Sequence, residues 1–142
     1  MNLETLQEQW RIDSKLDQDL HDNDSIAIPQ LHMKYMGFHN TYSLMKRERD
    51  IEMKRLVKNK WLYYKGKAPT TIYKEMPFDL KLTTKEEVLM FIEADDDITK
   101  LQFKIDYLEQ VLFFLDGVLR MINNRTYHIK NAIEWKRFNA GF

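Results

Sequence analysis

The sequence predicts an all-α protein made of a few long helices, with a C-terminal heptad helix that assembles into an oligomeric helical bundle. Hydrophobic residues make up 44% of the 142 residues and charged residues 31%, a balance that supports one folded core and long solvated faces. Only four glycines and three prolines are present, so few turns are available. The length favours a single helical domain that covers residues 1–142.

Neither a secretory leader nor a membrane span is expected. The N-terminus lacks a charged segment followed by an apolar one, and no apolar run reaches about 18 residues. No cysteine occurs, which excludes disulfides and thiolate ligands and agrees with a reducing compartment. The composition therefore indicates a cytosolic protein.

The first helix is expected from Leu3 to Leu20, with Asn2 as its N-cap. Apolar residues recur along it at helical spacing, namely Leu3, Leu6, Trp10, Leu16 and Leu20. The HDNDS stretch that follows has the composition of a turn.

A second helix is expected from Pro29 to about Tyr64. Proline suits a first turn, where its missing N–H has no intrahelical partner, and Asp24 or Ser25 can cap it. About 35 residues at about 1.5 Å each give a helix of about 50 Å, longer than a compact domain of this size needs. Part of it should therefore project or pack against another chain, and Gly66 is expected to end it.

The KAPTTIYKEMPFDL stretch, residues 67–80, contains two prolines and is expected to be an irregular connection. Thr84 and Glu87 form a capping-box pair that starts a third helix. In the acidic EADDD run, Asp95 or Asp96 is expected to cap the next helix and to complement its dipole.

The fourth helix carries the most regular apolar pattern. Its seam advances by alternating steps of three and four over more than three heptads, at Ile98, Leu101, Ile105, Leu108, Leu112, Leu115, Leu119 and Ile122. A second stripe lies beside it, at Tyr107, Val111, Phe114, Val118 and Met121. Such a wide face needs other helices of the chain or neighbours in an oligomer, and the shortage of other strongly apolar helices favours an oligomer. We expect the contact at Ile105, Leu108, Leu112, Leu115, Leu119 and Ile122, with a last helix from Arg125 to Phe138.

The net charge of zero hides a strong asymmetry. Between Lys46 and Lys67 nine basic residues face three acidic ones, a net charge of +6, so the rest of the chain carries −6. A local positive field on a neutral protein indicates a directed contact with a polyanion.

Two interpretations of this basic segment stay open on the residues alone. A solvated helix face is one, because Glu48, Asp50 and Glu52 can pair with neighbouring cations. Single-strand binding is the other, because no acid lies within a turn of the last four lysines: Lys58, Lys60, Lys65 and Lys67. Three aromatics are interleaved with them, Trp61, Tyr63 and Tyr64, which could stack on bases or pack in the core.

No catalytic or metal site is predicted. The four histidines lack metal-ligand spacing, and Asp95–Asp97 lacks the glycine and the terminal glutamate of a calcium loop. The sequence contains neither a phosphate-cradling glycine loop nor a nucleophile elbow. We therefore expect no enzyme activity and no cofactor.

LVKNKWLYYKG, residues 56–66, resembles the basic motif followed by two tyrosines and a glycine in the UvsY family of phage recombination mediators. Further matches follow in order: ADDDITK before the long helix, an arginine, aromatic and Ile-Lys pattern after it, and a closing RFNAGF. The opening LETLQEQW also looks like the family's first helix. The resemblance spans most of the chain and is weakest from about Leu20 to Met45.

The resemblance implies a protein without enzyme activity that binds single-stranded DNA and assembles as a ring-like homo-oligomer of about six or seven subunits. It also implies that the protein helps to load a phage RecA-like recombinase onto strands covered by the phage single-strand-binding protein, in the cytoplasm of the infected host cell. Residues 1–67 then contain the DNA-binding motif, and residues 84–142 form the oligomerisation helices.

The family's two cationic positions fall on Lys58 and Lys60, the second of which can also be arginine. Together with their neighbours they give the expected DNA-binding set, Lys54, Arg55, Lys58, Lys60, Lys65 and Lys67. The alternative function is a helical structural or interaction module that docks a partner through the heptad helix and does not bind DNA directly.

Overall fold

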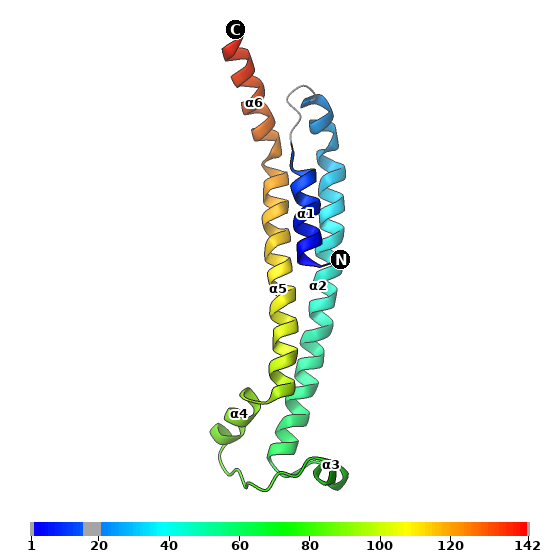
Figure 1. The fold of residues 1–142 in the computed structure, drawn as a ribbon, viewed down its shortest axis with the longest axis vertical. Coiled ribbons are helices and arrows are strands. Elements are labelled where there is room, and N and C mark those ends of the chain that lie inside the picture. Colours follow the sequence, from blue (N-terminus) through cyan, green and yellow to red (C-terminus); the bar gives the residue numbers. More distant parts are fainter. Residues whose placement is uncertain (1, 16–20, 142) are drawn as a thin grey trace. The chain divides into compact units, whose positions relative to one another are not determined.

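The computed structural model of the chain describes residues 2–15 and 21–141, and in the second segment it describes side chains from residue 27 onward. Every regular element within these residues is a helix, which confirms the predicted all-α class (Figure 1). The helices are α1 Leu3–Asp13, α2 His21–Tyr64, α3 Thr70–Glu75, α4 Lys85–Glu93, α5 Asp96–Asn123 and α6 Arg125–Asn139.

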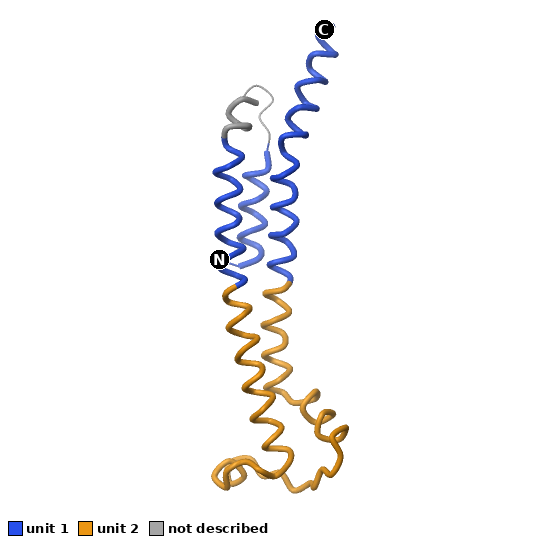
Figure 2. Tube along the Cα trace, turned by 180° about the vertical axis from the view of Figure 1, so that it is seen from behind, with its two compact units in different colours: residues 1–43, 110–142 blue, residues 44–109 orange. Residues whose placement is uncertain are grey.

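The chain forms two compact units (Figure 2). Unit 1 contains residues 1–43 and 110–142, and unit 2 contains residues 44–109. The long helices α2 and α5 contribute to both units. Each unit thus combines N-terminal and C-terminal segments.

In unit 1, α1 packs on α2 through an aromatic contact. Asn2 caps α1 as predicted, because its side chain accepts the backbone N–H of Thr5 at 2.8 Å. Trp10 meets the fully buried Tyr35 of α2 edge to face, with 5.3 Å between ring centroids. Burial and the hydrogen bond that its hydroxyl donates to Asp13 at 2.9 Å both raise the pKa of Tyr35. This polar contact fixes the end of α1 against α2.

The ends of both N-terminal helices differ from the predicted ones. Helix α1 ends at Asp13 rather than Leu20, and the predicted residues 16–20 lie outside the described part of the chain. Helix α2 begins at His21, so the prediction that Pro29 occupies a first turn was wrong. An interior proline removes one backbone hydrogen bond, and here the helix continues through it.

Gly66 ends α2 as predicted, with a positive φ of 77°. The N–H of Gly66 donates to the carbonyl of Tyr63 at 3.2 Å, and the N–H of Lys67 donates to that of Leu62 at 2.8 Å. These two bonds form a Schellman motif, which requires a left-handed residue and therefore favours glycine. The chain leaves the helix at the end of the basic segment.

Unit 2 is built around α2, α4 and α5. Val88, Ile92 and Ile98 form a buried cluster, and the half-buried side chains packed against it are Met53, Leu56, Val57, Trp61, Tyr64 and Leu82. Thr84 caps α4 as predicted, accepting the N–H of Glu87 at 3.2 Å.

The connection after Gly66 was expected to be irregular, yet it contains the six-residue α3. Its two flanking prolines and short length concealed this helix in the sequence.

The buried face of α5 differs from the predicted seam in its second half. Ile98, Leu101, Ile105 and Leu108 are buried, but the next buried position is Val111 and not Leu112. The buried residues beyond it are Leu115, Val118 and Ile122, with Leu112 and Leu119 half-buried. In unit 1 the buried face is therefore centred between the two predicted apolar stripes.

This burial corrects the premise on which an oligomer was preferred. Four of the six expected contact residues are buried within the single chain, namely Ile105, Leu108, Leu115 and Ile122. The chain thus covers much of the seam by itself. Other large side chains are left exposed, including Phe103, Phe113, Tyr127, Trp135 and Phe138.

Replacing Leu115 by alanine should lower the free energy of unfolding by about 2 to 5 kcal/mol, because it empties a fully buried site. Phe113→Ala provides a control on the same helix, since its side chain is 75% exposed. It should change stability by only about 0.5 kcal/mol. Urea unfolding followed by circular dichroism measures both, and equal effects would contradict the described burial.

Candidate nucleic-acid interface

The six predicted DNA-binding residues do not share one face of α2. Successive residues of an α-helix are turned by about 100°, so residues three or four apart are neighbours and residues two apart are not. Lys54 and Lys58 lie one above the other, with Arg55 beside them. Lys60 lies on the opposite side of the helix from Lys58. One flat contact with a strand cannot include both Lys58 and Lys60.

One face of α2 carries a stripe of exposed cations, which we call the cationic stripe: Arg47, Lys54, Arg55 and Lys58. It extends over about 16 Å, given 1.5 Å per residue. Among the described residues none of the four has a carboxylate partner. Arg47 was counted in the basic segment but was not predicted as a site residue. Its spacing of seven from Lys54 was the signal that could have identified it.

Other cations of the basic segment are offset by acids, as the solvated-face interpretation expected. Lys46 pairs with Asp50 at 3.0 Å and Arg49 pairs with Glu52 at 2.8 Å, both within α2. Lys46 also lies 3.7 Å from Glu109 of α5. These pairs reduce the positive charge at the beginning of the segment and leave the cationic stripe as its exposed part.

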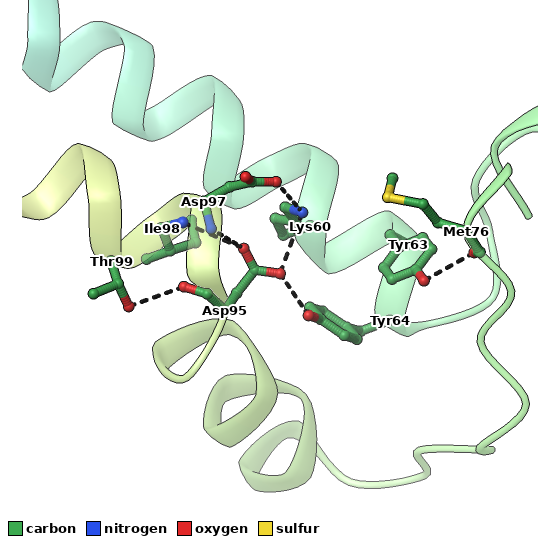
Figure 3. A network of polar contacts seen from close by, with 8 residues as sticks. All are labelled: Lys60, Tyr63, Tyr64, Met76, Asp95, Asp97, Ile98 and Thr99. Carbon is green, nitrogen blue, oxygen red and sulfur yellow. Dashed lines mark hydrogen bonds and ion pairs between the residues drawn. The ribbon is translucent and has the colours of Figure 1, made fainter.

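Lys60 is the exception among the last four lysines. Its ammonium lies 2.8 Å from the Asp97 carboxylate and 3.2 Å from that of Asp95, and its side chain is only 13% exposed (Figure 3). The prediction that Lys60 belongs to an uncompensated patch was therefore wrong, because its partners lie more than thirty residues away in the sequence. Burial lowers the pKa of Lys60, but its hydrogen bonds to Asp97 and Asp95 outweigh this effect and raise it.

Asp95 organises this polar network at the start of α5. One carboxylate oxygen accepts the backbone N–H groups of Asp97 at 2.9 Å and Ile98 at 3.3 Å, as predicted for a cap. The other oxygen accepts the Tyr64 hydroxyl and the Lys60 ammonium (Figure 3). Burial raises the pKa of Asp95, but these hydrogen bonds outweigh it and lower the pKa. Burial and the bond to Asp95 raise the pKa of Tyr64.

The three aromatics of the motif are engaged within unit 2. Trp61 and Tyr64 pack against the buried cluster, which is the core-packing alternative left open by the sequence. The Tyr63 ring stacks on Tyr73, with 5.4 Å between centroids, and its hydroxyl donates to the carbonyl of Met76 at 2.9 Å. The rings thus hold the connection after Gly66 against the end of α2, and they are not arranged as an open stacking surface.

The last two lysines of the predicted set lie at the end of α2. Lys67 is exposed, and its ammonium lies over the Trp61 ring at 5.3 Å from the centroid. Lys65 is half-buried. Neither has a carboxylate partner among residues 2–15 and 21–141. They can extend the positive field of the cationic stripe beyond the helix.

The described residues contain neither a candidate metal site nor a helix able to cross a membrane. No cluster of three or more histidine, aspartate or glutamate side chains there could hold a metal ion. None of the described helices combines the length and apolar character that crossing a bilayer requires. The cationic stripe and the polar network around Asp95 are therefore the candidate functional features of the described residues.

An all-α chain with exposed cations on one long helix, and with its aromatics packed beneath, defines a helical protein suited to binding a polyanion. A family described as the recombination, repair and ssDNA binding protein UvsY matches residues 9–142. The chain belongs to this family. The expected resemblance is confirmed.

The chain is similar to individual relatives over nearly its full length. The chain is 25% identical to the recombination protein uvsY of Enterobacteria phage T4 over 141 residues, which is 99% of each chain. It also resembles crystal structures of the bacteriophage T4 recombination mediator protein UvsY. The lattice type IV structure has a TM-score of 0.85 at 23% identity, covering 97% of this chain and 99% of that one. The lattice type II structure has a TM-score of 0.85 at 24% identity, covering 99% of this chain and 98% of that one.

Asp95→Asn should lower the free energy of unfolding at pH 7 by about 1 to 3 kcal/mol, because it removes the charge that Lys60, Tyr64 and the start of α5 share. Folding lowers the pKa of the Asp95 carboxylate below its usual value of 3.8. The carboxylate therefore stabilises the protein at pH values above 3.8, and this stabilisation is lost as the pH falls through the folded pKa. The stability difference between the wild type and the variant should therefore shrink in acid.

Asp96→Asn is the matched control, since Asp96 is exposed and stands next to Asp95 in the sequence. We expect it to change stability by only about 0.5 kcal/mol. Urea unfolding at pH 7 and near pH 3 measures both variants. Equal stability of the two variants at pH 7 would contradict the assigned role of Asp95.

Proposed function

We propose that the chain binds single-stranded DNA without sequence specificity and promotes the loading of a RecA-like recombinase onto strands covered by a single-strand-binding protein. Its membership of the UvsY family supports this proposal, and so does the name of the phage T4 relative as a recombination mediator. The observation that carries the proposal is the cationic stripe of α2, which has no carboxylate partner among the described residues.

The cationic stripe is suited to phosphates rather than bases. Its lysine and arginine side chains present donors and positive charge, which attract a phosphate backbone regardless of its sequence. Trp61, Tyr63 and Tyr64 pack within unit 2 and are not free to form a continuous platform for base stacking. We therefore infer sequence-independent binding that weakens steeply with salt.

A ring-like homo-oligomer of six or seven subunits would multiply these contacts. A few phosphate contacts from one chain give weak binding, but linked copies act at high effective concentration on the same strand. Exposed aromatics on the C-terminal helix α6 supply apolar surface for the subunit contact: Tyr127, Trp135 and Phe138. Leu112 and Leu119, which are half-buried, remain predicted contributors to it.

Such a ring would act in the cytoplasm of the infected host cell. By bending or wrapping a strand it would weaken the hold of the phage single-strand-binding protein and stabilise the first contacts of the phage recombinase. Both actions need only phosphate contacts and repeated subunits, and neither needs a reactive group or a cofactor.

Lys58→Ala should weaken binding to oligo-dT and reduce the salt slope by about one for each subunit that engages the strand. Lys104→Ala is the control, because Lys104 is an exposed lysine of the same unit outside the basic segment. Fluorescence anisotropy titrations at several salt concentrations measure affinity and slope. If the two variants behave alike, the cationic stripe is not the binding surface.

Combining Trp135→Asp with Phe138→Asp should dissociate the oligomer, because both side chains are exposed on the chain and a carboxylate is costly to bury between subunits. Native mass spectrometry with and without oligo-dT reports subunit number and strand binding together. Glu134→Asp on the same helix keeps the charge and should retain the wild-type mass. An unchanged mass in the double variant would exclude α6 as the contact.

A further inference from the structure

The two carboxylates that hold Lys60 differ in how firmly they are themselves held. Asp95 is 7% exposed and already accepts two backbone N–H groups and the Tyr64 hydroxyl. Asp97 is 58% exposed, and within the described part of the chain its carboxylate has Lys60 as its side-chain partner (Figure 3). Asp95 is therefore a fixed partner of Lys60, and Asp97 is an exchangeable one.

We propose that Asp97 occupies the position on Lys60 that a DNA phosphate takes, so that a strand gains this contact by displacing the Asp97 carboxylate. The inference rests on the proposed function and adds to it a residue that sets the affinity of the site. Asp97 acts against binding in the DNA-free chain, while Asp95 keeps the Lys60 ammonium in place for either partner.

The exchange preserves the electrostatic balance around Lys60. A phosphate oxygen is an anionic acceptor like the carboxylate oxygen that it replaces, so the ammonium keeps two negative partners throughout. The released Asp97 side chain turns to water, where most of its surface already lies. Its negative charge stays in the first turn of α5, where the helix dipole favours it. No buried charge is left unpaired at any stage.

Because of its position, Lys60 can make a contact with a strand that the cationic stripe cannot make. Lys60 lies on the opposite side of α2 from Lys58, so a strand contacts both only if it curves around the end of the helix. Competition from Asp97 makes this second contact weak and reversible. A protein that must pass a strand on to another protein benefits from a contact that is released easily.

Asp97→Asn tests the inference against Asp96→Asn. Both changes remove one negative charge from the first turn of α5, but only Asp97 contacts Lys60. Asp97→Asn should tighten oligo-dT binding up to about fivefold for each engaged subunit, which is the range for an exposed ion pair. Its salt slope should also become steeper. Asp96→Asn should have a small effect at physiological salt, where exposed charges are screened beyond about 8 Å.

Two further variants assign the effect to Lys60. Asp97→Ser, a second neutral replacement, should give the same gain, and Asp97→Glu should retain the affinity of the wild type. Adding Lys60→Ala to Asp97→Asn should abolish the gain. Equal effects of Asp97→Asn and Asp96→Asn, or a gain that survives the loss of Lys60, would overturn the inference.

Lys58→Ala separates this inference from the proposed function. If Lys58→Ala weakens binding while Asp97→Asn and Asp96→Asn bind alike, single-strand binding stands and only the exchange at Lys60 is wrong. If the wild type itself does not bind oligo-dT, the proposed function fails and the exchange fails with it.

Discussion

The interaction on which unit 2 depends is the contact of Asp95 with Lys60 and Tyr64. A carboxylate with so little exposure needs hydrogen bonds to most of its lone pairs, and the sequence supplies them from two distant places. The backbone at the start of α5 provides two donors, and the last turns of α2 provide the other two. The same carboxylate thus caps one helix and joins it to another. The segment between Gly66 and Thr84 connects two ends that this contact already holds together.

This contact also decides which cations of α2 remain available. Pairing to Asp95 and Asp97 draws Lys60 toward α5, while helical periodicity turns Lys54 and Lys58 toward solvent. The aromatics that looked like a stacking surface instead fill the space beneath, where Trp61 and Tyr64 cover the buried cluster. Packing of the rings and exposure of the lysines are two consequences of one helix orientation. The basic motif is thereby divided into a side that packs within unit 2, where Asp95 and Asp97 hold Lys60, and a side whose cations face solvent.

Local features of the fold were predictable from the sequence because their signals lie within one turn. The caps at Asn2, Thr84 and Asp95 and the end of α2 at Gly66 are of this kind. Features that depend on distant partners were not predictable. The pairing of Lys60 joins residues 37 positions apart, and no rule of neighbouring charges reveals it. The burial of Leu115 within the chain likewise depends on which helices fold back on α5, whereas the heptad pattern says only that something covers it.

Under the proposed function, the division of charges would make one chain a weak ligand for a strand and would favour binding by several copies. Of the nine basic residues between Lys46 and Lys67, three have carboxylate partners: Lys46, Arg49 and Lys60. The positive field that a strand meets is therefore smaller than the net charge of +6 suggests. Affinity for DNA rises with the number of phosphates neutralised, so a single cationic stripe, which can neutralise only a few, would hold a strand only loosely at physiological salt. Repetition of the stripe around the proposed oligomer would restore affinity while each separate contact stays weak. Weak separate contacts would let a strand leave one subunit at a time.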